Sequence, residues 1–460
     1  MSTALFDLAQ AGRWLGVPVL GDPLTPVLRV HTDTRSLQAG DLYVALRGER
    51  FDGHDFLGQL AAQGVRAAMA ETGLQAHDLS GLEVADTRQA LGDLAAAWRR
   101  QHDLRLIAVT GSNGKTTVTQ MIASILRAHA GDAVLSTQGN FNNDIGVPLT
   151  LLRLRPEHRL AVLELGMNHP GEIERLALWA RPDVALVNNA QREHQEFMHS
   201  VEAVAQENAA VFRALAANGV AVFPADDAFT PMWTQLAGGR RSITFGAGGD
   251  VRVEHSQAES IGWRAGVRIG EQALELELHL PGLHNLRNAL AAIACCTAAE
   301  IPLAAIAQGL ARFRPVSGRS QAQLLHCGDR SLTLIDDTYN ANPDSVRAAI
   351  DVLAQLPGPR LLVLGDMGEV GTQGPQFHAE VGDYARQRGI DHLMTFGDLA
   401  QRSAQAHGAA QHHDRIEDLC TAVQQQLPHL GSVLIKGSRF MRMERVVRHL
   451  EELTKEQQPC

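Results

Sequence analysis

The sequence is poor in cysteine and contains no long apolar run, and both absences limit the kinds of protein it could encode. Its five cysteines are odd in number and scattered, with no Cys-x-x-Cys pair: Cys295, Cys296, Cys327, Cys420 and Cys460. We therefore expect no disulfide framework and no zinc knuckle, and a reducing, cytoplasmic location fits this usage best. The longest apolar stretch, 289–299, is shorter than the roughly 18–20 residues of a membrane span. Residues 1–17 predict a short amphipathic helix, not a secretory signal.

Lysine is also scarce. Among the 41 basic residues, the lysines are Lys115, Lys436 and Lys455. Lys115 and Lys436 lie in glycine-containing motifs, where a compact ammonium can reach a single phosphate oxygen and a planar guanidinium is a poor replacement. The net charge of −10 disfavours general nucleic-acid binding, so an anionic ligand must meet cations that are gathered locally.

The chain has 460 residues, enough for about two to four domains. Short apolar runs alternate with helical patterns, which is typical of parallel α/β sheets. Strands are expected at 27–32, 42–46, 67–70, 104–109, 160–163, 184–187, 220–223, 332–335, 361–364, 393–396 and 433–435. Polar residues follow several of these runs, and ligands of such sheets bind outside the carboxyl ends of the strands. We predict three α/β domains, at 1–84, 85–315 and 316–460.

Residues 110–117 (TGSNGKTT) form the most specific motif, because they lie between an expected strand and an expected helix. Glycines let backbone N–H groups turn toward an anion, and the helix N-terminus adds its positive dipole end. Lys115 can then reach the β- and γ-phosphates of a nucleotide, while the Thr116 hydroxyl can hold Mg²⁺. Val109 stands where longer phosphate loops carry glycine, so this loop is of a shorter variety. The alternative is a glycine-rich turn with an exposed lysine.

Several polar positions at other strand ends are candidates for the same site. Glu164 could bind Mg²⁺ beside the phosphate loop, or be a solvated carboxylate at a strand end. His194 could contact metal or phosphate, or be structural. The segment 336–343 (DDTYNANP) could bind a ribose, an adenine or an amine, or form an Asx-type turn with a helix cap. Residues 436–439 (KGSR) could form a local anion site or a solvated helix start.

Together these motifs resemble the Mur ligases, the ATP-dependent amide ligases that build the peptide of bacterial cell-wall precursors. The resemblance covers essentially the whole chain and is carried by residues 33–35, 40–41, 48–54, 110–117, 139–148, 164–166, 284–285, 318–319, 365–367 and 436–439. The string at 339–343 (YNANP) is most similar to the branch of the family that adds D-alanyl-D-alanine.

The resemblance implies a UDP-sugar-binding first domain, a central P-loop ATPase domain and a Rossmann-like last domain. It also implies that ATP phosphorylates the free carboxylate of UDP-N-acetylmuramoyl-tripeptide. The amine of D-alanyl-D-alanine then attacks the acyl phosphate, and ADP and phosphate leave. This is the last cytoplasmic step in assembling the peptidoglycan peptide. The expected cofactors are ATP and Mg²⁺, and we expect a monomer that neither binds nucleic acid nor inserts into a membrane.

The resemblance implies roles for individual residues as well. The catalytic set is Lys115, Glu164 and His194, and the Mg²⁺ ligands are Thr116, Glu164 and His194. The ATP contacts are Gly111, Ser112, Asn113, Gly114, Lys115, Thr116, Thr117, Asn285, Arg319 and Asp337. The UDP-sugar substrate is contacted on its uridine side by Asp33, Thr34, Arg35 and Ser36, and on its sugar-peptide side by Asn140, Asn142 and Asp144. The candidates for the dipeptide and the acyl phosphate are Tyr339, Asn340, Asn342 and Lys436.

One departure from the family's usual pattern is informative. The family usually carries a lysine, modified to a carbamate, at the position where Asn208 stands here, and no lysine lies between the phosphate loop and residue 436. Either Glu193, Glu196 or Glu207 replaces the carbamate, or Asn208 organises the second Mg²⁺ through water. Competing hypotheses are a related ligase of the diaminopimelate-adding or folylpolyglutamate type, a P-loop regulatory protein, and a catalytically inactive homologue.

We predict that the enzyme is active and that added bicarbonate does not change its rate, because Asn208 cannot form a carbamate. The measurement is phosphate release from ATP in CO₂-depleted buffer, with and without bicarbonate. Restoration of activity by bicarbonate in the depleted preparation would contradict this prediction.

Overall fold

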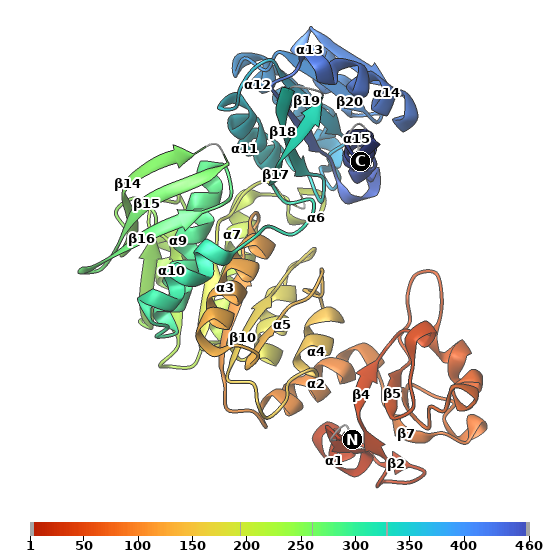
Figure 1. Cartoon of the computed structure of the whole chain (residues 1–460). Helices are drawn as coiled ribbons and strands as arrows, with labels where there is room; N and C mark the ends of the chain where they lie inside the picture. Colours follow the sequence, from red (N-terminus) through yellow and green to blue (C-terminus); the bar gives the residue numbers. More distant parts are fainter. Residues whose placement is uncertain (1–3, 194, 260, 328–329, 457–460) are drawn as a thin grey trace.

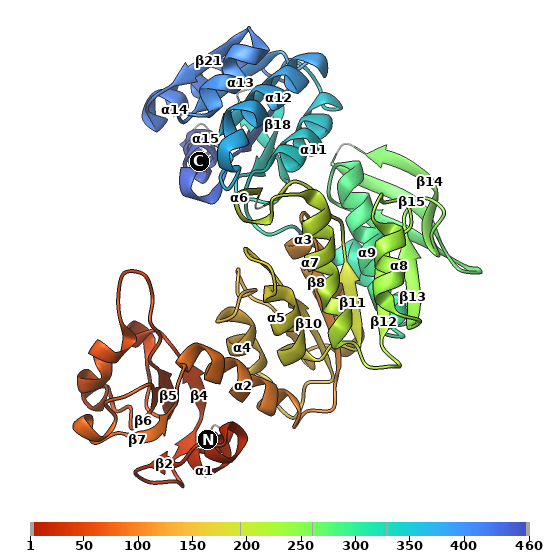
Figure 2. The same ribbon diagram turned by 180° about the vertical axis from the view of Figure 1, so that it is seen from behind.

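The structure is a computed structural model that describes residues 4–193, 195–259, 261–327 and 330–456. It contains three α/β units, each with its own main sheet, arranged in sequence order from the N-terminal to the C-terminal end (Figure 1). Figure 2, the view from behind, shows the middle unit between the other two. Within the described ranges, no helix is both long and apolar enough to cross a membrane.

The N-terminal unit has a five-stranded sheet in the order β2-β7-β6-β5-β4. The strands are β2 (Val19–Leu20), β4 (Arg29–His31), β5 (Asp41–Val44), β6 (Ala67–Ala70) and β7 (Ser80–Glu83), and all but β2 run parallel. A separate antiparallel pair joins β1 (Phe6–Asp7) to β3 (Pro26–Val27). The single strand expected at 27–32 is therefore wrong: the chain changes partner at Leu28, whose N–H donates to the Gly40 carbonyl.

The amphipathic helix expected in the first residues is confirmed as α1 (Leu8–Leu15). Asp7 caps it, since its side chain accepts a hydrogen bond from the Gln10 N–H while the Gln10 side chain accepts one from the Asp7 N–H. Phe6 and Trp14 pack against Trp98 of α2 (Thr87–Arg99), with ring centroids 5.8 and 6.3 Å away. The N-terminal unit is thus joined to the middle unit through a shared apolar core.

The middle unit has a nine-stranded sheet in the order β16-β15-β14-β13-β12-β11-β8-β10-β9. Its parallel strands are β8 (Arg105–Thr110), β9 (Val134–Ser136), β10 (Leu160–Glu164), β11 (Val184–Val187), β12 (Val220–Pro224) and β13 (Arg241–Phe245). Side chains alternate between the faces, so Leu106 and Ala108 pack into one core while Ile107 and Val109 pack into the other. The first face is covered by α2, α4 (Gly146–Leu151), α5 (Glu172–Ala180), α7 (Val201–Ala209) and α8 (Thr230–Ala237). The second is covered by α3 (Lys115–Ala130), α9 (Leu283–Ala298) and α10 (Leu303–Arg312).

An antiparallel extension of this sheet was not predicted. It consists of β14 (Val251–Glu259), β15 (Gly262–Ile269) and β16 (Gln272–Leu278). The buried and exposed residues of β16 alternate, because one face of this outer strand meets solvent. Continuous apolar runs, which marked the buried parallel strands, are therefore absent from it.

The C-terminal unit has a six-stranded sheet in the order β17-β18-β22-β19-β20-β21. Its strands are β17 (Gln321–Cys327), β18 (Arg330–Asp337), β19 (Arg360–Gly365), β20 (His392–Phe396), β21 (Ala410–His413) and β22 (Ser432–Lys436), all parallel except β17. The helices are α11 (Pro343–Ala354), α12 (Gly374–Gln387), α13 (Ala400–His407), α14 (Ile416–Gln426) and α15 (Glu444–Glu456). The sheet is buried on both faces, with α11 and α12 on one and α14 and α15 on the other.

The strands expected in the middle and C-terminal units are confirmed to within about two residues at each end. Because the carboxyl ends of their parallel strands carry polar residues, each unit presents a polar edge toward the other. The short helix α6 (Gln195–Met198) lies where the two units meet (Figure 2).

Candidate active site

A cavity of about 920 Å³ lies between the middle and C-terminal units, at the carboxyl ends of strands from both sheets. It brings together sequence positions that are far apart, from the phosphate loop, from the strand ends of the middle sheet and from β18 and β22. The predicted site residues that line it are Ser112, Asn113, Gly114, Lys115, Thr116, Thr117, Asn140, Asn142, Asp144, Glu164, Asn285, Arg319, Asp337, Tyr339, Asn340, Asn342 and Lys436.

Residues 110–117 cover the end of β8, a tight loop at 111–114 and the first turn of α3. Gly111 and Gly114 have φ values of 128° and 80°, which only glycine adopts without strain. A Cβ atom on Gly114 would lie 2.4 Å from Asn288 Oδ1, so the loop also needs glycine for space. The 16-residue helix α3 begins directly at Lys115, and no side chain caps its first turn. The N–H groups of such an uncapped first turn are suited to binding an anion.

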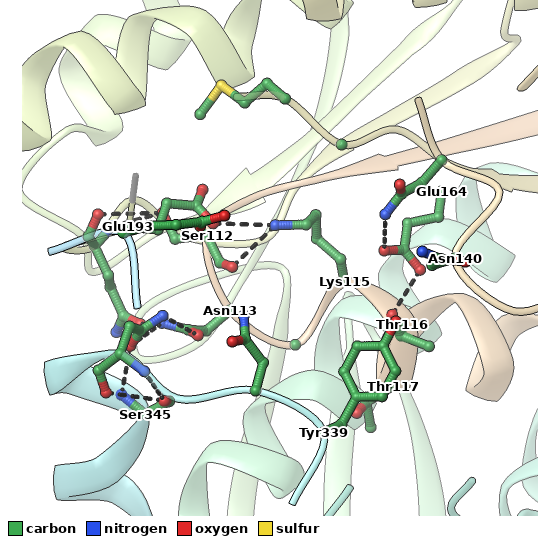
Figure 3. Close-up of a pocket in the computed structure, with 18 of the residues that line it drawn as sticks. Ser112, Asn113, Lys115, Thr116, Thr117, Asn140, Glu164, Glu193, Tyr339 and Ser345 are labelled. Carbon is green, nitrogen blue, oxygen red and sulfur yellow. Dashed lines mark hydrogen bonds and ion pairs between the residues drawn. The ribbon is translucent and has the colours of Figure 1, made fainter. Parts of the chain in front are cut away.

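Lys115 points along the loop (Figure 3). Its Nζ donates to the carbonyl oxygens of Gly111 (2.6 Å) and Ser112 (3.0 Å), and it pairs with Glu193 Oε2 at 3.1 Å. The side chain is 15% exposed and that of Glu193 is 6% exposed. The ammonium is therefore held at the mouth of the loop by neutral acceptors and one carboxylate, where an incoming phosphate can compete for it.

Glu164 and Thr116 place two oxygen donors together at the end of β10. The Thr116 hydroxyl donates to Glu164 Oε2 at 2.7 Å, and Asn142 Nδ2 donates to Glu164 Oε1 at 2.8 Å (Figure 3). Hard oxygen ligands suit Mg²⁺, which takes one or two protein ligands and keeps several waters. These residues therefore fit Mg²⁺, although the described ranges hold no cluster of three or more His, Cys, Asp or Glu for a metal. The third predicted ligand, His194, lies outside the described residues.

Asn208, at the position where the resemblance implies a lysine, contacts the phosphate loop itself. Its Oδ1 accepts a hydrogen bond from the Gly111 N–H at 2.9 Å, and its backbone carbonyl accepts one from Thr110 Oγ1 at 3.1 Å. The residue is 1% exposed, and its Nδ2 has no partner among the described residues. Two of the proposed carbamate substitutes are engaged elsewhere: Glu207 accepts from the Ile173 N–H at the start of α5, and Glu193 pairs with Lys115.

The C-terminal edge of the cavity carries a buried lysine and a stacked tyrosine. Lys436 Nζ lies 2.5 Å from Asp337 Oδ2 and donates to the Asn340 carbonyl at 2.9 Å. The Arg319 guanidinium lies 4.1 Å from the centroid of the Tyr339 ring, a cation–π distance. This edge therefore combines cations, an aromatic ring and amides, as the sequence predicted.

Two titratable groups near this edge have shifted pKa values. Burial lowers the pKa of His284, an effect that Lys436 reinforces and Asp337 opposes, so the imidazole is neutral at pH 7. Burial raises the pKa of Asp336, whose carboxylate accepts hydrogen bonds from the Gly318 N–H and from Thr338. Asp336 thus holds the turn that presents Arg319 and Tyr339 to the cavity.

Some predicted residues lie away from this cavity. Asp33, Thr34, Arg35 and Ser36 form a short 3-10 helix with its cap in the N-terminal unit, and they are not among the lining residues. Gly111 belongs to the phosphate loop but does not line the cavity, and its N–H donates to Asn208 Oδ1.

Asp144, in contrast, lines the cavity, where it pairs with Arg88 and Arg175 at 3.1 and 3.6 Å.

The sequence analysis missed Arg192, Asn189, Gln191 and Asn288 as site residues. Asn189 Oδ1 accepts from the Asn113 N–H and Gln191 Oε1 accepts from Asn113 Nδ2, so the segment after β11 holds the phosphate loop. The polar pair Asn188-Asn189 after a buried strand was a usable signal for this. Arg192 has no such signal, since it is one arginine among many.

Three family models match the chain. They are described as "Mur ligase family, catalytic domain" over residues 27–99, "Mur ligase middle domain" over 109–296 and "Mur ligase, glutamate ligase domain" over 318–439. The UDP-N-acetylmuramoyl-tripeptide–D-alanyl-D-alanine ligase of Escherichia coli is 41% identical over 428 residues, which is 92% of this chain and 93% of that protein.

Solved structures agree with this finding. A crystal structure of MurF from Acinetobacter baumannii has a TM-score of 0.91 at 35% identity, covering 97% of this chain and 99% of that one. MurF ligase from Thermotoga maritima in complex with ADP has a TM-score of 0.83 at 26% identity, covering 94% of this chain and 98% of that one.

Glu164→Gln is expected to weaken the binding of Mn²⁺, as a Mg²⁺ analogue, at least about 10-fold in the presence of ADP, because an anionic oxygen ligand becomes a neutral amide. Electron paramagnetic resonance titration measures this. Glu174→Gln is the matched control, because Glu174 pairs with Arg213 on the surface at 2.6 Å and should leave Mn²⁺ affinity unchanged. Equal Mn²⁺ affinity in Glu164→Gln and the wild type would remove Glu164 from the metal site.

Proposed function

The chain belongs to the Mur ligase family, and we propose that it joins D-alanyl-D-alanine to UDP-N-acetylmuramoyl-tripeptide in the cytoplasm, using ATP. The observation that supports this most directly is the single cavity that holds both the phosphate loop around Lys115 and the Tyr339–Lys436 edge. An acyl-phosphate ligase needs such a cavity, because the phosphoryl donor, the carboxylate and the amine must meet in one place.

The reaction has two chemical steps. A carboxylate oxygen of the tripeptide attacks the γ-phosphorus of ATP, the bond to the β-γ bridging oxygen breaks, and ADP leaves. The amine of the dipeptide then attacks the acyl carbon, phosphate leaves, and the new amide nitrogen loses a proton. Activation is needed because a free carboxylate repels nucleophiles and has a poor leaving group.

The residues of the chain fit these steps. Lys115 and the uncapped first turn of α3 would offset the negative charge that spreads over the transferred phosphoryl group. The oxygens of Thr116 and Glu164 would hold Mg²⁺, which when bound supplies charge neutralisation at the phosphates. Asn285, Arg319 and Asp337 are proposed ATP contacts. Tyr339, Asn340, Asn342 and Lys436 are proposed to bind the dipeptide and the acyl phosphate.

The N-terminal unit is proposed to bind the UDP-sugar, with Asp33, Thr34, Arg35 and Ser36 on the uridine side. The proposed domain boundaries remain 1–84, 85–315 and 316–460. Asn140, Asn142 and Asp144 would meet the sugar and peptide between this unit and the phosphate loop. We also propose that the enzyme acts as a monomer.

We expect rapid phosphate release from Mg-ATP only when UDP-N-acetylmuramoyl-tripeptide and D-alanyl-D-alanine are both present, with one amide formed per phosphate. Colorimetric phosphate detection together with mass spectrometry of the product measures both quantities. D-glutamate, diaminopimelate and L-glutamate serve as control acceptors.

Two results would contradict the proposal, and they differ in meaning. Phosphate release that follows another acceptor would point to a ligase with a different amine substrate. Slow hydrolysis that neither substrate accelerates would point to a nucleotide-dependent regulatory protein.

A further inference from the structure

The segment 188–193, which follows β11, contacts the phosphate loop through several side chains. Asn189 Oδ1 accepts from the Asn113 N–H at 2.9 Å, and Asn189 Nδ2 donates to the Asn113 carbonyl at 2.9 Å. Glu193 pairs with Lys115. A displacement of this segment must therefore move the loop that holds the nucleotide phosphates.

Arg192 of the same segment points away from the phosphate loop and binds the C-terminal unit. Its Nη2 donates to Asp344 Oδ1 at 2.6 Å, and its backbone N–H donates to Asp344 Oδ2 at 2.9 Å. Its Nη1 and Nη2 donate to the two carboxylate oxygens of Glu380 at 2.8 and 3.0 Å. The guanidinium also lies 5.3 Å from the centroid of the Phe377 ring. Asp344 belongs to the first turn of α11, and Glu380 and Phe377 belong to α12.

This cluster is stronger than an ordinary surface ion pair. The side chain of Arg192 is 24% exposed and those of Asp344 and Glu380 are 23% and 30% exposed, so solvent screens the charges only in part. The two carboxylates raise the pKa of Arg192, with Glu380 the larger cause, and Arg192 lowers the pKa of Glu380. Arginine suits the position because its planar fork can bind two carboxylates at once.

We propose that Arg192 is a positioning residue that holds the C-terminal unit closed over the phosphate loop during the reaction. This inference rests on the proposed ligase function. While Arg192 is bound to Asp344 and Glu380, the edge with Lys436 and Tyr339 faces Lys115 across the cavity. Because Asn189 and Glu193 bind the loop from the same short segment, the position of the C-terminal unit is tied directly to the phosphate site.

Closure of this kind serves the chemistry in two ways. It places the amine-binding edge near the acyl phosphate, and it keeps water from hydrolysing that intermediate. Loss of the Arg192 contacts should therefore affect amide formation and its coupling to ATP use. The phosphate contacts of the nucleotide should persist, because Lys115 and the loop glycines belong to the middle unit, whereas the proposed ATP contacts of Arg319 and Asp337 come from the C-terminal unit and should weaken.

The structure offers a matched control. Arg347 pairs with Glu380 Oε1, which also accepts from Arg192 Nη2, at 3.0 Å. Arg347 and Glu380 both belong to the C-terminal unit, on α11 and α12 respectively. Arg347→Met therefore removes a cation from the same cluster without removing the ion pairs between the units. Arg192→Met removes those ion pairs and leaves the neutral hydrogen bond between Asn113 and Asn342 in place.

The experiment compares wild type, Arg192→Met, Arg347→Met and Asp344→Asn by small-angle X-ray scattering with Mg-ADP, and by steady-state kinetics. For Arg192→Met we expect a larger radius of gyration and a fall in kcat for the amide of about 10-fold or more. We also expect more than one phosphate released per amide. In Asp344→Asn the radius of gyration and the phosphate released per amide should rise and kcat should fall, as in Arg192→Met. In Arg347→Met all three quantities should match those of the wild type.

Raising the salt concentration should expand the wild type and leave Arg192→Met unchanged, since the contacts are ionic. Equal radii of gyration in wild type and Arg192→Met would overturn the proposal, even if activity fell, because Arg192 would then act on substrate directly. Should Arg192→Met fail to fold, Arg192→Lys replaces it, because lysine keeps the charge but lacks the planar guanidinium. A wild-type radius of gyration and one phosphate released per amide in Arg192→Lys would equally contradict the proposal. The scattering arm does not need amide formation, so it distinguishes failure of the closure role from failure of the proposed function.

Discussion

The phosphate loop is the constraint on which the other parts of the site depend. Gly114 fits only because it lacks a side chain, since Asn288 and Asn188 pack against its Cα. Once the loop is closed in this way, its successive residues face different elements. Gly111 meets Asn208 of α7, Thr116 meets Glu164 of β10, and Asn113 meets both the segment after β11 and Asn342 at the start of α11. The loop thereby sets the positions of four elements, not only that of a nucleotide.

The electrostatics of the site are local, as an acidic chain requires. Lys115 and Lys436 lie on opposite edges of the cavity, and each is paired in advance with a carboxylate, Glu193 and Asp337 respectively. Burial without a partner would be costly for either ammonium. With a partner, each ammonium can occupy a nearly buried position and transfer part of its interaction to an anionic substrate. The overall charge of −10 therefore does not oppose the binding of ATP or of a UDP-sugar.

Much of this arrangement could be predicted from the sequence, because its signals are local. The buried parallel strands appear as short apolar runs, and the residues after them are the polar edge of the sheet. Residues 110–117 can be identified as a phosphate-binding loop from their own sequence, without knowledge of distant residues. Strands β14 and β16 escaped prediction because exposed, mostly polar residues interrupt or replace their apolar ones. Arg192 escaped for a different reason: its partners Asp344 and Glu380 are more than 150 residues away, and only the packing of two units brings them together.

Asn208 shows how a change in one residue can alter what the loop depends on. A buried amide is neutral at every pH, so its hydrogen bond to the Gly111 N–H forms when the chain folds and needs no further chemistry. Its Nδ2 is buried without a partner in the described part of the chain, and leaving such a donor unpaired typically costs about 1–3 kcal/mol. A lysine at the same place would need a counter-charge or a modification to remain buried beside the loop. Asparagine avoids that requirement, so this contact to the phosphate loop forms on folding without a covalent modification or a counter-charge.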